Sequence, residues 1–121
     1  LLVADLPLLD SISRMSILHI FAASAQDLVN TAWSVAKLFF YHSPLMVAIS
    51  YAAIRQIAEF CPVHLSNIAW SYATLKLVDH PLLEAISKQA LRKLQEFAPQ
   101  NLSNSAWAFA VLAWRHQPLL E

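Results

Sequence analysis

The chain has 121 residues and a formal net charge of zero, so no overall positive field draws it to nucleic acid, and such binding must come from a local patch. Hydrophobic residues make up 58% and glycine is absent, which argues against a β-protein with tight hairpins and excludes a glycine-rich phosphate loop. The single cysteine, Cys61, excludes an internal disulfide.

A short phrase, Asn-x-Ala-Trp, recurs along the chain at a constant interval. It lies within DLVNTAWSVA, HLSNIAWSYA and NLSNSAWAFA, and each copy starts 37 residues after the one before. Four prolines keep the same interval: Pro7, Pro44, Pro81 and Pro118. A fixed period of this length is typical of repeat architectures. We therefore expect one solenoid domain with these parts: repeat 1 at 7–43, repeat 2 at 44–80, repeat 3 at 81–117, the end of a preceding repeat at 1–6 and the start of a following one at 118–121.

The first half of each repeat has the pattern of an amphipathic helix. Proline suits the first turn, where its missing N–H costs nothing, and we expect this helix to run to about Ala23, Phe60 and Phe97. Apolar residues recur at the spacing of one helix face. They are Leu9/Met46/Leu83, Ile12/Ile49/Ile86, Ile17/Ile54/Leu91 and Ile20/Ile57/Leu94.

The second half of each repeat predicts another helix. It begins at Pro62 and Pro99, and in the first repeat Ser24 and Asp27 supply an N-cap and a first-turn acid instead. We expect these helices to end near Tyr41, Val78 and Arg115. They are apolar around most of their circumference, so neighbours should bury both flanks. The sequence therefore predicts an all-α fold, an α-solenoid of about three helix-turn-helix repeats in a right-handed superhelical stack.

One asparagine of each phrase falls on the polar strip of the second helix. These residues, Asn30, Asn67 and Asn104, form a column that either fixes the stacking register as a ladder or contacts the backbone of a ligand that repeats along the array. The tryptophan three positions later lies at the border between the polar strip and the core, where it is expected to fill volume between repeats.

The outer face of the first helix carries most of the basic residues. The candidate RNA-binding set is Arg14, Tyr51, Arg55, Lys88, Arg92 and Lys93. Basic side chains with an aromatic among them suit phosphate pairing and base stacking. The alternative is a solvated helix surface, because Glu59 and Glu96 lie nearby.

Neither a catalytic nor a metal site is predicted. His42, Asp79 and His116 share one column at the end of the second helix, where cations complement the helix dipole. No base can be named for Cys61, so we expect no enzyme activity and no cofactor. Polar residues interrupt the longest apolar stretch, so no membrane insertion is expected.

The stretch APQNLSNSAWAFAVLA at 98–113, with PLLEAISKQALRKLQEF before it, resembles the octotricopeptide and heptatricopeptide repeat families. Related patterns occur in RNA-editing substrate-binding complex subunits and in FAST-kinase-like proteins with a RAP domain. CPVHLSNIAW at 61–70 matches nearly as well, whereas Ala25 replaces the proline in the first repeat.

The resemblance implies binding of single-stranded RNA, such as organellar transcripts, in a mitochondrion or plastid, for RNA processing, stability or translation. The alternative function is a protein-interaction scaffold of armadillo or HEAT type that binds other protein subunits. Neutral charge and high hydrophobic content favour this alternative.

Overall fold

The computed structural model describes residues 6–115, and every element within them is helical. The predicted all-α class is therefore confirmed. The elements in chain order are α1 (Leu6–Leu18), η1 (Ile20–Ala22), α2 (Ala25–Lys37), α3 (Ser43–Gln56), η2 (Ile57–Glu59), α4 (Pro62–Thr74), α5 (His80–Arg92), η3 (Leu94–Glu96) and α6 (Pro99–Arg115). The expected partial repeats at the two ends lie outside the described residues, apart from Leu6.

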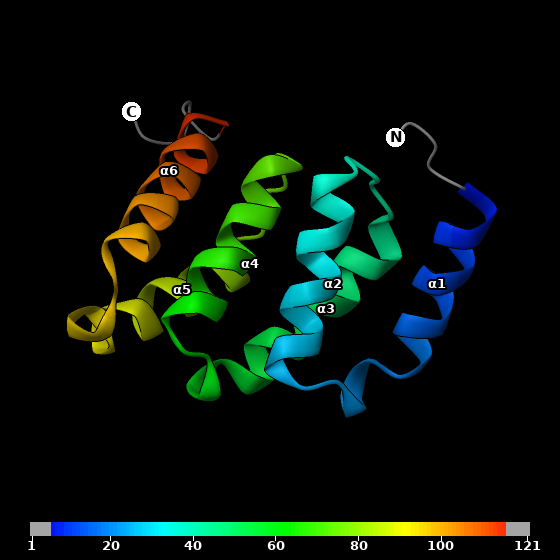
Figure 1. The fold of residues 1–121 in the computed structure, drawn as a ribbon, viewed down its shortest axis with the longest axis horizontal. Coiled ribbons are helices and arrows are strands. Elements are labelled where there is room, and N and C mark those ends of the chain that lie inside the picture. The colour runs from blue at the N-terminus through cyan, green and yellow to red at the C-terminus, as the bar shows by residue number, and fades with distance from the viewer. Residues whose placement is uncertain (1–5, 116–121) are drawn as a thin grey trace.

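The six α-helices form two layers (Figure 1). One layer holds α2, α4 and α6, with α4 packed between the other two, and the second layer holds α1, α3 and α5 in the same order. Packing is closer in the layer of α2, α4 and α6. Contacts between α2 and α3 and between α4 and α5 join the layers.

Alanines explain the close approach of α2, α4 and α6. Ala32, Ala36, Ala69 and Ala73 are fully buried, and a methyl group is small enough for a neighbouring backbone to come near. On α4 eight of the 13 residues are buried, which confirms that neighbours cover both of its flanks. The Tyr72 hydroxyl donates a hydrogen bond to the Met46 carbonyl and so ties α4 to α3.

Two of the first helices, α3 and α5, begin at a side-chain cap. The Leu45 N–H donates to His42 Nδ1 at 3.2 Å, and the Leu82 N–H donates to Asp79 Oδ1 at 3.0 Å. The interpretation of His42 and Asp79 as groups at the end of the preceding helix is therefore wrong, because both side chains satisfy the first N–H groups of the next helix. His116, the third member of that column, lies outside the described residues.

Most of the helices end earlier than the periodicity predicts, whereas α6 ends at Arg115, as predicted. The first helices become short 3₁₀ turns before Ala23, Phe60 and Phe97. In the second helices, α2 ends at Lys37 and α4 at Thr74, about one turn before the predicted Tyr41 and Val78.

The cause in α2 and α4 is a left-handed residue just after the C-cap. Phe39 has φ 53° and Lys76 has φ 58°, at the position where glycine is the usual residue. The Phe40 N–H then donates to Val35 O at 2.9 Å, and the Leu77 N–H donates to Tyr72 O at 2.8 Å. These bonds close a Schellman motif, which a helical period alone cannot reveal.

Candidate nucleic-acid interface

Three tryptophans form a continuous row across α2, α4 and α6. The ring centroids of Trp33 and Trp70 are 6.3 Å apart, those of Trp70 and Trp107 are 6.4 Å apart, and the interplanar angles are 33° and 35°. The rings bridge neighbouring helices and fill volume between them. They also reach solvent, because Trp33 is 41% exposed and Trp107 46% exposed, while Trp70 is half-buried between them.

The asparagine column runs beside the tryptophan row, because each asparagine precedes its tryptophan by three residues and so lies on the same side of the helix. Asn30 Oδ1 accepts a hydrogen bond from Gln26 Nε2 of its own helix at 2.8 Å. Within residues 6–113, no hydrogen bond joins two of the asparagines, and the amides of Asn67 and Asn104 bond to no protein atom. No hydrogen bond among these residues therefore supports the expected ladder of asparagines that would fix the stacking register. Contact of the asparagine column with a ligand stays a prediction.

The surface around the row has little negative charge. Asp27 is the one acid in the sequence of α2, α4 and α6. Its carboxylate accepts from the Ser24 N–H at 3.3 Å, and its own N–H donates to Ser24 Oγ at 3.1 Å, in a capping box. Lys37 Nζ lies 5.3 Å from the centroid of the Trp33 ring, a cation–π contact that places one positive charge at the row.

A polar bridge joins α2 and α4 next to this surface. The Cys61 N–H donates to His64 Nδ1 at 3.2 Å, so the ring proton of the neutral histidine lies on Nε2 and is donated to Gln26 Oε1 at 3.1 Å. Burial, and then the charge of Lys93, lower the pKa of His64 and favour this neutral form. Cys61 Sγ lies 3.3 Å from His64 Nδ1. The sequence pattern did not indicate that His64 lies beside Cys61. The hydrogen bond from the Cys61 N–H shows that the His64 side chain caps the start of α4.

Several of the predicted RNA-binding cations on the other layer are engaged by protein groups. Arg14 Nε lies 2.7 Å from Asp10 Oδ2, and Lys88 Nζ lies 3.3 Å from Glu84 Oε2. Lys93, which is half-buried, donates from Nζ to the Phe60 carbonyl at 2.9 Å. These three residues already have partners that an incoming phosphate would need to displace or share.

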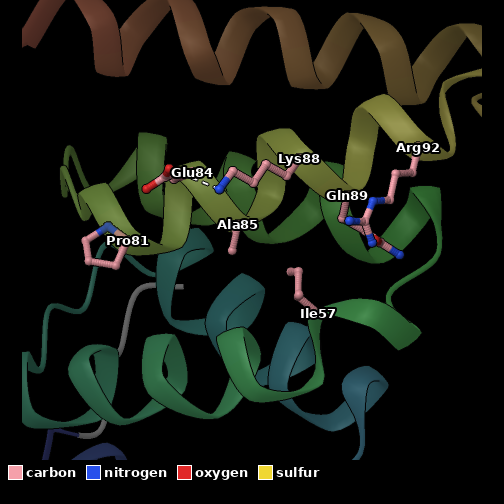
Figure 2. Close-up of a pocket in the computed structure, with 7 residues that line it drawn as sticks. All are labelled: Ile57, Pro81, Glu84, Ala85, Lys88, Gln89 and Arg92. Atoms are coloured by element: carbon pink, nitrogen blue, oxygen red, sulfur yellow. Dashed lines mark ion pairs between the residues drawn. The ribbon is translucent and has the colours of Figure 1, made fainter.

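Three cations of that set line two separate grooves. Lys88 and Arg92 line a groove of about 320 Å³ on α5, together with Glu84, Gln89 and Ile57 (Figure 2). Its other lining residues are Pro81 and Ala85. Lys88 and Arg92 are exposed, as predicted for residues on the outer face of the first helix. Glu84 places a negative charge in the same groove.

Arg55 lines the other groove together with Phe21, Ala23, Ala52 and Gln56. Its guanidinium carbon lies 5.4 Å from the centroid of the Phe21 ring, and Phe21 packs edge to face on Tyr51 at 6.1 Å. The helical periodicity gave no indication of Phe21, because this residue lies in the turn after α1 rather than on the face of an α-helix. The predicted basic and aromatic cluster is thus divided into Arg55 with Tyr51 and Phe21, and Lys88 with Arg92.

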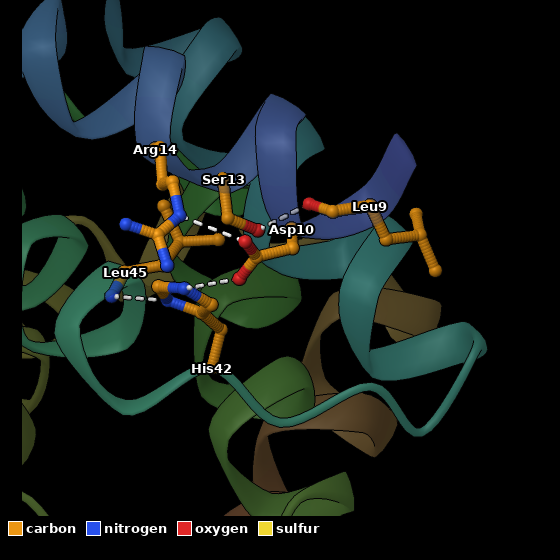
Figure 3. A network of polar contacts seen from close by, with 6 residues as sticks. All are labelled: Leu9, Asp10, Ser13, Arg14, His42 and Leu45. Carbon is orange, nitrogen blue, oxygen red and sulfur yellow. Dashed lines mark hydrogen bonds and ion pairs between the residues drawn. The ribbon is translucent and has the colours of Figure 1, made fainter. Parts of the chain in front are cut away.

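Arg14 takes part in a network that joins α1 to α3 (Figure 3). Asp10 Oδ2 accepts from Arg14, and Asp10 Oδ1 lies 3.4 Å from His42 Nε2. The hydrogen bond from Arg14 and the neighbouring charges hold the pKa of Asp10 below its ordinary value. His42 therefore contacts α1 through one ring nitrogen and caps α3 through the other.

Other kinds of site have no support in the described residues. No group of three or more His, Cys, Asp or Glu within residues 6–115 is placed to hold a metal ion. No helix in this part of the chain has the length and apolar character needed to cross a membrane.

The fold and the surface define an all-helical domain with an exposed row of aromatic and amide side chains. The family described as Tbc2 translation factor, N-terminal domain, matches residues 2–120, and the chain belongs to this family. No curated protein and no solved structure gives a significant match. The family links the domain to translation.

This match corrects the resemblance to octotricopeptide and heptatricopeptide repeats, which was wrong, and with it the expected relation to RNA-editing complex subunits and RAP-domain proteins. The reason is physical. Any helix pair that packs on similar pairs favours proline at helix starts, alanine where backbones meet and a bulky ring at the junction. Such a pattern reports helix packing and does not identify one family.

Proposed function

We propose that this domain binds single-stranded RNA as a non-catalytic module of a translation factor. The contact surface is the row of Trp33, Trp70 and Trp107 with the asparagine column beside it. The observation that carries the proposal is the stack of three solvent-reached rings next to amides that, among the described residues, bond to no neighbouring helix.

The chemistry of this surface suits unpaired bases. An indole ring offers a stacking face for any base, and each base–aromatic stack contributes about 1–3 kcal/mol. An asparagine amide both donates and accepts hydrogen bonds, so it can pair with a base edge or a ribose hydroxyl. Lys37 can pair with a phosphate at one end of the row.

The proposal includes three 37-residue repeats in one right-handed solenoid, at 7–43, 44–80 and 81–117. Equivalent positions of neighbouring pairs support it. Leu28 and Leu65 are equally buried, as are Ala32 and Ala69, and the tryptophan spacing is nearly constant along the row. Each pair then supplies one ring and one amide, so ligand contacts add along the stack. Location in a mitochondrion or plastid stays a prediction, tested by imaging the full-length protein.

The test adds a negative charge to the column without changing side-chain shape. We expect Asn67→Asp with Asn104→Asp to weaken binding of an unstructured RNA oligonucleotide about tenfold or more, because carboxylates repel phosphates and cannot donate hydrogen bonds. Gln95→Glu places one added carboxylate on exposed η3 of the other layer and should leave affinity unchanged, whereas Asn67→Asp alone, which adds the same single charge, should weaken it. Fluorescence anisotropy measures the affinity, and circular dichroism verifies the fold.

The cations of the other layer provide the opposing test. With Lys37 as the main phosphate contact, the logarithm of affinity should fall by about 0.7 per tenfold rise in salt. A slope of two or more, removed by Arg55→Ala with Arg92→Ala, would move the RNA site to the layer of α1, α3 and α5. No RNA binding at low salt would exclude the function.

The second candidate, a protein-interaction scaffold of armadillo or HEAT type, is favoured by a different observation. Apolar side chains are exposed at the two ends of the helix stack, on α1 and on α6. These ends are away from the middle of the tryptophan row, so the two functions are compatible in one domain.

A further inference from the structure

The middle helix of the layer formed by α1, α3 and α5 differs from its two neighbours on its outer face. On α1 and on α5, two positions one turn apart hold an ion pair, which is Asp10 with Arg14 at 2.7 Å and Glu84 with Lys88 at 3.3 Å. The residues of α3 at the equivalent positions are Val47 and Tyr51, which are 64% and 59% exposed. Because α3 contacts both α1 and α5, this exposed apolar pair lies in the middle of the layer and not at either end.

A third apolar side chain extends this pair. The Phe21 ring of η1 is 65% exposed and packs edge to face on the Tyr51 ring, with 6.1 Å between the centroids. The residues equivalent to Phe21 in the other two turns are Ala58 and Gln95, which are smaller or polar. Val47 and Tyr51 lie one turn apart on the same face of α3. Phe21, Val47 and Tyr51 therefore form one exposed apolar patch, the α3 patch, and an exposed patch with a polar rim is typical of an interaction site.

Two arginines lie on the same face as the α3 patch. Arg55 follows the apolar pair by one turn on α3, and its guanidinium contacts the Phe21 ring. Arg92 is the equivalent residue of α5 and lines the groove shown in Figure 2. Within residues 6–115 neither guanidinium makes an ion pair or a hydrogen bond, and the carboxylates of the following turns, Glu59 and Glu96, pair with neither. The face therefore has two positive charges that no carboxylate in this part of the chain neutralises.

We propose that this face binds an acidic amphipathic helix of another protein. Val47, Tyr51 and Arg55 follow one another at intervals of four residues, so they span about 12 Å, which two turns of a partner helix can match. Apolar side chains of the partner cover the α3 patch, and its carboxylates pair with Arg55 and Arg92, because a guanidinium binds a carboxylate through two parallel hydrogen bonds. RNA fits this face less well, since Val47 offers no ring on which a base could stack. The proposal rests on the scaffold alternative, to which it gives a surface and a partner class, and not on RNA binding at the tryptophan row.

The experiment selects binding peptides without assuming their sequence. A phage-displayed library of alanine-based helical peptides with randomised surface positions is panned on the unaltered chain and, in parallel, on the variant Val47→Glu with Tyr51→Lys. This variant gives α3 the same kind of ion pair that α5 has, so its fold should hold and its net charge is unchanged. We expect the unaltered chain to enrich peptides with one apolar face and an excess of Asp and Glu. Fluorescence anisotropy should show that these peptides bind the variant about tenfold more weakly, or weaker still.

Two further comparisons separate the apolar and the charged contributions. Arg55→Gln with Arg92→Gln should weaken the enriched peptides about tenfold and remove most of the salt dependence of their binding. Val47→Glu alone should also weaken them. Val63→Glu is its matched control, because Val63 is an exposed valine of α4 in the other layer, and this change should leave peptide affinity unchanged.

The proposal would be overturned by a selection that enriches no peptide, by enriched peptides without an acidic excess, or by equal binding to the variant of Val47 and Tyr51. An unstructured RNA oligonucleotide whose affinity falls with the same substitutions would assign the face to RNA and overturn it too. If the peptide selection fails while RNA affinity is unaffected by changes on α3, this proposal alone is lost and RNA binding at the tryptophan row stands.

Discussion

The two helical layers of this domain differ in the side chains that pack them together and in the charges on their surfaces. The layer of α2, α4 and α6 is close-packed on alanine and carries one acid, and its surface amides and indoles face outward. The layer of α1, α3 and α5 carries most of the charges, and Arg14, Lys88 and Lys93 are engaged by protein groups. The comparison teaches that basic side chains can be engaged by the protein itself, so the number of cations on a layer does not by itself predict an RNA-binding surface.

The largest expected effect comes from breaking the close packing of the first layer. Ala69→Leu should lower the free energy of unfolding by about 1–3 kcal/mol, because the added atoms force α4 away from its neighbours. Ala106→Leu makes the same change at the equivalent position of α6, which is exposed, and should cost much less. Urea unfolding at low protein concentration measures both, and equal losses would show that the alanines do not set the spacing.

A smaller effect is expected at the caps that begin the helices of the second layer. Asp79→Ala should lower the free energy of unfolding by about 1 kcal/mol, because the Leu82 N–H loses its acceptor. His42→Ala should cost at least as much, since His42 caps α3 and also contacts Asp10 of α1. Thermal unfolding compares them, and His42→Asp, which restores the cap alone, separates the two contributions of His42.

A gain in stability, below about 1 kcal/mol, is expected at the helix ends of the first layer. Lys76 has φ 58°, where a side chain is disfavoured and glycine is not. Lys76→Gly should therefore raise the urea midpoint with an unchanged slope. Lys88→Gly provides the contrast, because Lys88 lies inside α5, where glycine should destabilise. A loss of stability in Lys76→Gly would argue against the left-handed C-terminal motif.

The smallest effect concerns pH and the bridge between α2 and α4. The pKa of His64 in the folded chain is lowered from 6.5, so the unfolded chain binds more protons around that pH. The contribution of neutral His64 to stability is present above pH 6.5 and decreases as the pH falls below it. His64→Gln should flatten this part of the stability curve, measured by urea unfolding between pH 5 and 8 as a rough working range. An unchanged curve would exclude His64 as the source.

Sequence periodicity predicted the helices, their pairing and the exposure of Arg55 and Arg92, because these follow from which residues must avoid water. It did not predict the ends at Lys37 and Thr74, since the left-handed Phe39 and Lys76 depend on backbone geometry without glycine. It also missed the contacts of Phe21 with Arg55 and of Cys61 with His64, because Phe21 and Cys61 lie in the turns between helices, where no helical period applies. The exposure of the tryptophan row depends on the distances between neighbouring helices, and a helical wheel, which describes one helix alone, gives no information on those distances.

The central claim is that the tryptophan row and the asparagine column contact RNA. The most direct measurement is a two-dimensional NMR titration of the domain with an unstructured RNA oligonucleotide, following indole and asparagine side-chain N–H signals. We predict that the signals of Trp33, Trp70 and Trp107 and of Asn67 and Asn104 shift first, at the lowest RNA concentrations. Shifts confined to residues around Arg55 and Arg92, with the indole and amide signals unmoved, would contradict the account.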